Sequence, residues 1–346
     1  MSETAGEPQD AEAEALAAKI ELYRHLMPAA PVALAEKVRS GSPGGGEPDL
    51  PALFSLKAAE ALPPPTLAVP AAPLWPALDA AAARNRALGC MLGLAVGDAI
   101  GASVEFKTRG SFRPLTGMAG GGPFNLAPGE WTDDTTMALC LAESLLAMGE
   151  VDQQDLMQRF EHWLTRGENS VNGRCFDIGI TTRTAIERFA ATGVASAGSS
   201  AADTAGNGSL VRLAPVAVFY RADGHAASFM ASKQSRATHA APECLDACQL
   251  FTAILLDALA GADKVMATRQ RVMALTPKLL FISGGDWKDK TRNEIRSSGY
   301  VVDTLEAAVW SVWQTDNFRD AVLTAANLGD DADSVAAVAG QLAGAL

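Results

Sequence analysis

The stretch GEWTDDTT at residues 129–136 decides how the rest of this chain is interpreted. It places Thr132, Asp133 and Asp134 side by side, directly before apolar residues at helical spacing over residues 137–146. Thr and Asp are favoured where a helix begins, because their oxygens accept the first free N–H groups and carboxylates meet the positive end of the helix dipole. One interpretation of the stretch is therefore an ordinary helix start.

A second acidic stretch lies near the other end of the chain, where residues 328–334 read LGDDADS. It places Asp331, Asp333 and Ser334 at the beginning of another helix, one that is rich in small residues. Two acidic helix starts that face one another across a cleft would attract hard cations, which take oxygen ligands. The second interpretation of residues 132–134 is therefore one half of a metal site.

The side chains of these two stretches would supply oxygen atoms, without sulfur or nitrogen. Such a set suits Mg²⁺ or Mn²⁺ rather than tetrahedral Zn²⁺. Crowded carboxylates repel one another or take up protons unless cations neutralise them, and a pair of divalent ions would balance the four Asp side chains. A two-metal site can orient substrate hydroxyls and activate a water molecule. The expected ligands are Thr132, Asp133, Asp134, Asp331, Asp333 and Ser334.

The composition describes a folded, acidic protein. The chain has 346 residues, of which 48% are hydrophobic and 6% aromatic, and its formal net charge is −12. The hydrophobic share excludes global disorder, and the scarcity of aromatics beside abundant Ala and Gly favours close-packed helices over a β-sandwich. Nucleic-acid binding needs clustered Lys and Arg, so the charge argues against it. A basic partner would suit this charge.

The cysteines and the N-terminus indicate the compartment. The chain has 5 cysteines and no CxxC motif, and an odd number does not form a complete disulfide framework. Cys244 and Cys248 lie four residues apart in an apolar stretch, which favours core packing over metal binding. The first residues lack the pattern of a signal peptide, and no apolar run is long enough to span a bilayer. We expect reduced thiols, a cytoplasmic location and no membrane contact.

Residues 1–80 form an extension of different composition. Twelve of the 18 prolines lie before residue 85, and eleven acidic residues against six basic ones occur through Arg84. Short helices are expected over residues 12–27, 31–38 and 51–62, followed by an extended segment over residues 63–76. The extension either packs on the main domain or stays partly unfolded, or it is an arm that docks on a partner.

The remainder of the chain has a helical pattern. We find no run of alternating strands and no fixed-period repeat. After a first helix that includes Arg84, helices are expected over residues 135–148, 153–164, 179–191, 213–220, 226–238, 242–260, 265–280, 302–315, 318–326 and 333–345. The prediction is an all-α domain over residues 81–346, with the extension before it.

The first of these helices carries a stripe of glycines at residues 89, 93 and 97. Such a stripe lets another helix approach closely, despite the low helix propensity of glycine. It is not a phosphate loop, because it lacks Gly-Lys-Ser/Thr. Asp98 interrupts this small-residue face and needs a partner if it is buried. The helix is expected to end before Glu105.

Two polar stretches lie between later helices. Residues 203–212 read DTAGNGSLVR, a Gly/Asn turn before an apolar helix, where backbone N–H groups can receive a phosphate. His239 follows the end of another predicted helix. A lone histidine is more often a hydrogen-bonded structural residue than a catalyst, and no nucleophile signature accompanies this one.

Together these motifs resemble the ADP-ribosylglycohydrolase family, which includes the dinitrogenase-reductase-activating glycohydrolase and the mammalian ADP-ribosylhydrolases. The resemblance covers the chain from about Arg84 onwards. Several separated motifs in the right order are a specific signal, unlike any one of them alone. The matching pieces are GLAVGDAIG at residues 93–101 with Glu105, WTDDT at 131–135, NGSLVRLAP at 207–215, Thr238-His239, SGYVVDTLEAA at 298–308 and GDDADS at 329–334.

The resemblance implies an all-α bundle with two metal ions that hydrolyses the glycosidic bond between the distal ribose of ADP-ribose and a protein side chain. The oxygen-bearing residues of the two acidic stretches match the metal ligands of the family. Glu105 matches an acidic residue with an acid/base or gating role, and we count Asp134 and Asp331 with it as catalytic. The implied substrate-binding residues are Asn207, Gly208 and Ser209 at the diphosphate, His239, and Tyr300 beside the nucleotide, where the alternative is a half-buried core tyrosine.

The chain departs from the family pattern at three places. Asp330 replaces the second Gly of the more common Gly-Gly-Asp, and Ser334 replaces a Thr, but the oxygens are retained. The chain stops at Leu346, where members usually continue, so we expect a truncated end or a missing last element. Residues 1–85 have no counterpart in the compact members.

Three alternatives stay open for the function. Arginine is the expected attachment site, because bacterial members most often act on it, but serine-linked, O-acetyl- and poly-ADP-ribose depend on pocket shape rather than motif. Some members resemble immunity proteins that also block a secreted ADP-ribosyltransferase toxin, and residues 1–80 are a candidate arm that occludes the basic cleft of such a toxin. The last alternative is a noncatalytic relative that only binds the toxin.

Overall fold

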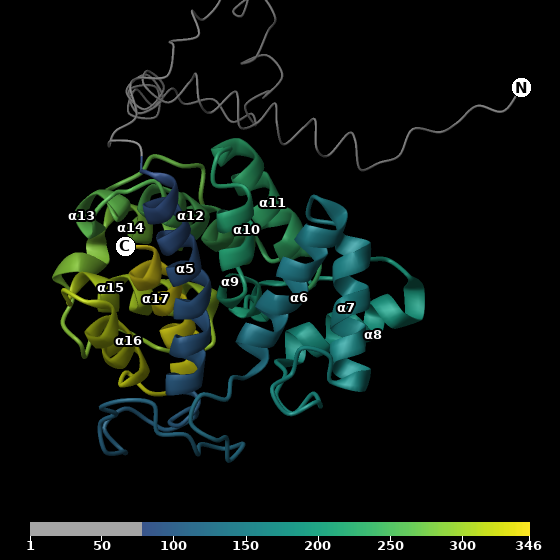
Figure 1. The fold of residues 1–346 in the computed structure, drawn as a ribbon, viewed down its shortest axis with the longest axis horizontal. Helices are drawn as coiled ribbons and strands as arrows, with labels where there is room; N and C mark the ends of the chain where they lie inside the picture. Colours follow the sequence, from purple (N-terminus) through teal and green to yellow (C-terminus); the bar gives the residue numbers. More distant parts are fainter. Residues whose placement is uncertain (1–77) are drawn as a thin grey trace, which may run out of the picture. The chain divides into compact units, whose positions relative to one another are not determined.

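The computed structural model describes residues 78–346, and every regular element within them is a helix (Figure 1). The strand-like pairings among these residues are isolated bridges only. The predicted all-α fold is therefore confirmed for this part of the chain, while the helices predicted over residues 12–62 lie outside it. The α-helices are α5 (Ala80–Gly101), α6 (Asp133–Met148), α7 (Gln153–Arg166), α8 (Ile180–Thr192), α9 (Gly208–Val211), α10 (Ala214–Phe219), α11 (Gly224–Arg236), α12 (Pro242–Leu259), α13 (Lys264–Ala267), α14 (Pro277–Gly284), α15 (Val301–Trp313), α16 (Phe318–Ala326) and α17 (Ala332–Ala345), with 3-10 helices η1 (Ala202–Thr204) and η2 (Asp286–Asp289).

One predicted helix is wrong. Instead of a single helix over residues 265–280, the chain forms the short α13 and, after an irregular segment, α14. Thr276 has φ −58° and ψ 152°, because the ring of the following proline disfavours the helical conformation in the residue before it. Arg269 and Arg271 in the irregular segment both pair with Asp257 of α12, so tertiary ion pairs hold this segment in its non-helical path.

The first and last helices of the domain form its centre. Helices α5 and α17 run side by side (Figure 1), and nearly all of α17 is buried. The predicted close approach along the glycine stripe is confirmed: a Cβ atom on Gly93 would lie 2.1 Å from the backbone oxygen of Gly340. At the end of α5, a Cβ on Gly101 would lie 2.3 Å from the Cα of Asp333. The stripe therefore brings the end of α5 against the acidic start of α17.

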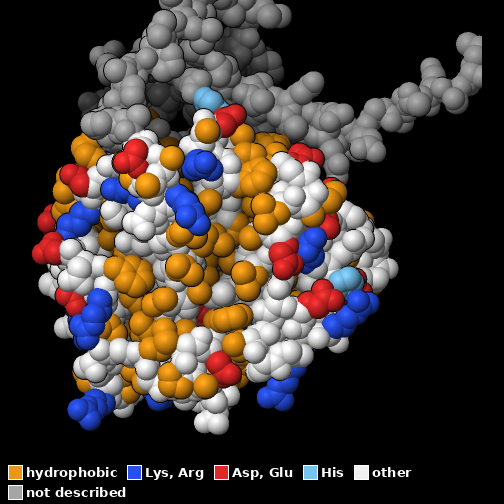
Figure 2. All heavy atoms as spheres, in the orientation of Figure 1, with side chains coloured by type: hydrophobic (Ala, Val, Ile, Leu, Met, Phe, Trp, Pro, Cys, Tyr) orange, Lys and Arg blue, Asp and Glu red, His pale blue; other side chains and the backbone are white. Residues whose placement is uncertain are grey.

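Hydrophobic side chains also gather on the outer face of α5 and α6. Figure 2 shows them as a band down the front of the molecule, and Leu92 is 63% and Leu146 79% exposed. A shallow apolar groove of about 190 Å³ lies between the two helices, with Trp131 at one end. It contains none of the acidic side chains, so it is separate from the site described next.

Candidate active site

Asp98 holds the acidic start of α6 in place. This aspartate is fully buried at the inner end of α5, and its carboxylate accepts the backbone N–H of Thr132 at 3.0 Å and that of Thr135 at 3.0 Å. Both threonine hydroxyls also donate to it, at 2.9 and 2.6 Å. Thr132 and Thr135 are therefore the hydrogen-bond partners that a buried Asp98 was expected to need.

This arrangement changes the interpretation of the helix start. Thr132 is the N-cap residue of α6, but its own side chain caps no backbone N–H group. Since Asp98 makes that cap from another helix, the neighbouring Asp133 and Asp134 are not needed for it, although both lie in the first turn. Their carboxylates still face the positive end of the helix dipole, which favours negative charge there.

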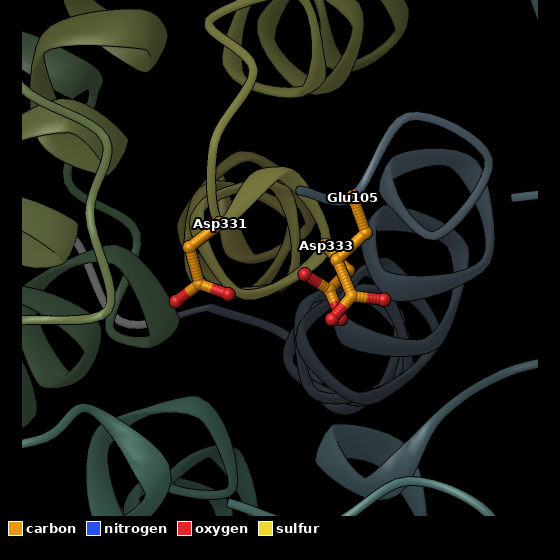
Figure 3. Close-up of side chains that lie close together, drawn as sticks. All are labelled: Glu105, Asp331 and Asp333. Atoms are coloured by element: carbon orange, nitrogen blue, oxygen red, sulfur yellow. The ribbon is translucent and has the colours of Figure 1, made fainter. Parts of the chain in front are cut away.

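The two acidic helix starts face one another. Asp331 is the N-cap of α17, Asp333 lies in its first turn, and Glu105 follows the end of α5. One carboxylate oxygen from each of these three residues lies within 4.8 Å of the others (Figure 3). The hydroxyl of Thr132 lies 3.4 Å from Oδ2 of Asp333, which joins the start of α6 to the start of α17.

Burial and mutual repulsion raise the pKa of these carboxyl groups. For Glu105, burial first and then the charges of Asp333 and the other acids raise the pKa to about 11. Burial likewise raises the pKa of Asp133, Asp134 and Asp333 well above the usual range. No Lys or Arg side chain within residues 78–346 forms an ion pair with any of these four. The cluster is therefore a concentration of carboxylates without a counter-ion from the described chain.

The donor set fits divalent metal ions. Oε2 of Glu105, Oδ2 of Asp134 and Oδ1 of Asp333 are buried oxygens with no hydrogen-bond partner among the described residues. Buried polar atoms normally have a partner, so each such atom needs an explanation. Oxygen ligands that converge from several elements without protein donors suit a hard cation such as Mg²⁺ or Mn²⁺.

Asp177 is a member of the cluster that the sequence did not reveal. It lies in the loop between α7 and α8, and its carboxyl group lies within hydrogen-bonding reach of that of Asp133, which requires a proton on one of the two. Burial, and after it the charge of Asp333, raises the pKa of Asp177 to about 7. The neighbouring Phe176 packs edge-on against Phe124, with ring centroids 5.3 Å apart, which positions the loop. A single Asp in a loop gives no pattern, so only the fold could place it here.

The turn at residues 206–209 borders the acidic cluster. The side-chain amide of Asn207 donates to Oδ2 of Asp331 at 2.6 Å and to the hydroxyl of Thr304 at 2.9 Å. Ser209 is fully buried, and its hydroxyl lies in hydrogen-bond contact with that of Ser235 at 2.8 Å. Asn207 thus lies beside the cluster, whereas the Ser209 side chain points into the core.

His239 packs directly against this turn. It is 2% exposed, and a Cβ atom on Gly208 would lie 2.8 Å from its Cε1. The glycine therefore leaves room for the imidazole, and any larger residue would displace it. The structure brings His239 together with Asn207 and Gly208, as the resemblance implied for the substrate-binding residues.

Tyr300 is the N-cap residue of α15 and lies beside the same turn, because Gly206 and Tyr300 form a backbone bridge. Its hydroxyl donates to Glu243 and accepts from Nζ of Lys278 at 2.8 Å. The Lys278 ammonium also lies 4.7 Å from the centre of the ring. The ammonium therefore lies beside the hydroxyl end of the half-buried ring, and the ring faces stay available for a stacked base.

The cysteines of the described chain form no disulfide. All five are free thiols, and Cys244 and Cys248 are buried in α12. The prediction of core packing for this pair is confirmed.

Comparison with known proteins identifies the family. The family model described as ADP-ribosylglycohydrolase matches residues 79–346. The chain belongs to the ADP-ribosylglycohydrolase family. It is 53% identical over 264 residues to the ADP-ribosylarginine hydrolase Tri1 of Pseudomonas putida (strain GB-1), a match that covers 76% of this chain and 71% of the relative. Its identity to the Tri1 of Serratia proteamaculans (strain 568) is 51% over 262 residues, with the same coverage.

A more distant relative and a solved structure agree. The ADP-ribosyl-[dinitrogen reductase] glycohydrolase of Rhodospirillum rubrum is 37% identical over 267 residues, 75% of this chain and 85% of the relative. A chain of a solved ADP-ribosylglycohydrolase-related protein complex superposes with a TM-score of 0.67 and 42% identity, over 77% of this chain and 88% of that one. The ADP-ribosylglycohydrolase family of glycosidase-type hydrolases, predicted from the motifs, is confirmed. No helix in residues 78–346 is long and apolar enough to cross a membrane.

Proposed function

We propose that this protein is a divalent-metal-dependent hydrolase that removes ADP-ribose from arginine side chains of proteins. The observation that carries the proposal is the convergence of carboxylates from four separate parts of the fold, with buried oxygens that no described group satisfies. The names of the relatives at 53% and 51% identity, both ADP-ribosylarginine hydrolases, support arginine as the attachment site.

We assign the metal-holding role to the two helix starts. Asp133 and Asp134 with Thr132 would bind from α6, and Asp331, Asp333 and Ser334 from α17. Glu105 is close enough to Asp331 and Asp333 to offer one further ligand oxygen. Bound Mg²⁺ or Mn²⁺ would neutralise the carboxylates, order the ribose hydroxyls and lower the pKa of a water molecule.

The chain's own acids would handle the protons. Hydrolysis breaks the bond between the anomeric carbon and the guanidinium nitrogen, so the leaving group must receive a proton and the attacking water must lose one. Glu105, with a carboxylate oxygen within 4.8 Å of oxygens of Asp331 and Asp333, would protonate the leaving group, and Asp177, beside Asp133, would accept the proton of the water. Asp134 and Asp331, predicted as catalytic, would act mainly by binding metal.

The turn at residues 206–209 would bind the ADP-ribose portion. Asn207 reaches Asp331 and therefore lies at the boundary between the acidic cluster and the turn. Since the Ser209 hydroxyl is engaged in the core, its contribution would come from the backbone of the turn rather than from the side chain. His239 and the ring of Tyr300 would complete this side of the site.

The test is release of ADP-ribose by the full chain from proteins modified on arginine or on serine, and from O-acetyl-ADP-ribose and poly-ADP-ribose. We expect rapid release from the arginine-linked substrate only. Preference for another substrate would support the hydrolase activity but reject arginine as the attachment site. No release from any of them would leave the noncatalytic alternative, in which the protein only binds its partner.

A second function concerns residues 1–80, which lie almost entirely outside the described residues. Their excess of acidic over basic residues suits a basic cleft, such as the NAD-binding cleft of an ADP-ribosyltransferase. We propose that they form an arm that occludes such a toxin. A chain that begins at Leu78 should hydrolyse normally but lose its affinity for the toxin, and unchanged affinity would reject the arm.

A further inference from the structure

A buried arginine lies behind the turn at residues 206–209. Arg212 is fully buried, and its guanidinium lies 4.8 Å from the ring centre of Phe160. Its hydrogen-bond acceptors are neutral: Gln234 accepts through Oε1 at 2.8 Å and through its backbone oxygen at 3.0 Å, and Thr238 Oγ1 accepts at 2.9 Å. No carboxylate within residues 78–346 forms an ion pair with it. A buried charge without a paired counter-ion is costly, so its retention needs an explanation.

Thr238 connects this charge to His239. The Thr238 hydroxyl lies 2.8 Å from Nδ1 of the imidazole. A guanidinium can only donate, so the hydroxyl accepts from Arg212 and still has one hydrogen to place. Thr238 is fully buried, and among the described residues Nδ1 is the acceptor within reach of that hydrogen. The hydroxyl therefore donates to Nδ1, because the reverse arrangement would leave a buried O–H group unsatisfied.

The hydrogen bond from the Thr238 hydroxyl to Nδ1 determines the tautomer of His239. With Nδ1 as acceptor, the neutral ring carries its hydrogen on Nε2. Burial, together with the charge of Arg212, lowers the pKa of His239 to about 3, which keeps the ring neutral.

Nε2 faces the turn that borders the acidic cluster. A Cβ atom on Gly206 would lie 3.4 Å from Nε2, so the two glycines of the turn leave space beside this nitrogen. No group in the described part of the chain accepts a hydrogen bond from Nε2. Asn207, between the two glycines, contacts Asp331 of the cluster. A ligand that reaches from the cluster across the turn would therefore meet this N–H group.

We propose that Arg212 and Thr238 are positioning residues that hold His239 as a neutral Nε2–H donor for an oxygen acceptor of the bound ADP-ribose. The inference rests on the proposed function for the identity of the ligand. The guanidinium polarises the hydroxyl, the hydroxyl orients the ring, and the ring presents one fixed donor. A neutral donor binds an oxygen near the carboxylates without pairing with the carboxylates themselves.

The test compares Thr238→Val, which removes the hydroxyl at similar volume, with Thr238→Ser, which keeps it. ADP-ribose affinity is measured by calorimetry on the full chain with Mg²⁺. The His239 tautomer is read from the nitrogen resonances of histidine-labelled protein, assigned with His239→Gln. We expect Nε2–H in the wild type and in Thr238→Ser. Thr238→Val should bind ADP-ribose roughly tenfold to a hundredfold more weakly, with unchanged metal-induced thermal stabilisation.

Several results would overturn the inference: an Nδ1–H ring in the wild type, no binding of ADP-ribose by the wild type, or wild-type affinity in Thr238→Val. If Thr238→Val fails to fold, Thr238→Ala and the wild-type tautomer decide. The proposed function fails separately. If the wild type hydrolyses no substrate but its ADP-ribose affinity depends on the Thr238 hydroxyl, the proposed function is rejected and the positioning role of Arg212 and Thr238 is kept. If the wild type hydrolyses its substrate but Thr238→Val leaves the ADP-ribose affinity unchanged, the function is kept and the positioning role is rejected.

Discussion

Asp98 caps a helix to which it does not belong: its carboxylate accepts both the backbone N–H of Thr132, at 3.0 Å, and the hydroxyl of the same residue, at 2.9 Å. This contact joins the glycine-rich α5 to the first turn of α6. It sets the position of Asp133 and Asp134 without using either of their side chains. The acidic site therefore depends on a residue that need not touch a metal ion or the substrate.

Replacing Asp98 should consequently damage both stability and the site. Asp98→Asn substitutes a donor for one of the acceptor oxygens and leaves buried N–H or O–H groups of Thr132 and Thr135 without a partner. We expect a loss of about 2–4 kcal/mol in the free energy of unfolding, measured with urea. Asp79→Asn is the matched control, since Asp79 caps α5 at the surface and Asn caps equally well. Equal stability of the two variants would contradict the role of Asp98.

Gly101 sets the distance between α5 and the start of α17. A Cβ there would lie 2.3 Å from Asp333 Cα, so Gly101→Ala must push the two elements apart. Overpacking of this kind costs about 1–3 kcal/mol, and here it also displaces the carboxylate of Asp333, a proposed metal ligand. We expect reduced stability and reduced metal affinity. Both are measured by thermal unfolding with and without Mn²⁺. Gly117→Ala, with no heavy atom within 4 Å of the added Cβ, should change neither.

Metal binding should stabilise the protein more at higher pH. The folded, metal-free cluster holds protons that the unfolded chain has lost, since the pKa of Glu105 is raised to about 11 and that of Asp177 to about 7. Carboxyl groups with a raised folded pKa favour the folded state below their unfolded pKa, and this contribution is lost as the pH rises through the folded values. A bound metal ion would restore this stabilising contribution, because it replaces the protons on the carboxyl groups. Mn²⁺ should therefore raise Tm more at about pH 7.5 than at about pH 5. A larger rise in Tm at the lower pH would contradict this linkage. In Asp133→Asn, the difference in the metal-induced rise between the two pH values should be smaller.

Asp177 should matter to turnover, although it belongs to neither acidic helix start. Asp177→Asn keeps the shape and the hydrogen-bonding capacity toward Asp133 but cannot take up a proton. We expect kcat to fall by roughly 100-fold or more, with metal-induced stabilisation largely retained. Asp289→Asn, an exposed aspartate on η2, is the control for loss of one charge. Wild-type kcat in Asp177→Asn would remove this residue from the proton transfers.

The sequence predicted the fold class, most helices and the two acidic stretches, because these depend on local pattern. The glycine stripe of α5 also indicated that another helix packs closely against it, and the structure shows that this helix is α17, which meets α5 at Gly93 and Gly340. The helix predicted over residues 265–280 failed because Pro277 and the ion pairs of Asp257 override local propensity.

The parts of the site that could not be predicted are those made by tertiary contacts alone. Asp177 lies in a loop without a motif, and the hydrogen bonds of Asp98 link residues 34 and 37 positions apart in the chain. The Ser209 side chain points into the core, and the Tyr300 hydroxyl is held by Glu243 and Lys278. A motif reveals neither of these contacts. Side-chain direction and partner choice arise only once the helices pack.

The central claim, metal-dependent hydrolysis of the arginine linkage, is tested most directly by one measurement. Release of ADP-ribose from an arginine-modified protein is followed for the full chain as prepared, after chelation of divalent metal, and after Mg²⁺ or Mn²⁺ is added back. The account predicts release that stops on chelation and returns with the metal, and no recovery in Asp133→Asn. Release that is indifferent both to the chelator and to Asp133→Asn would contradict it.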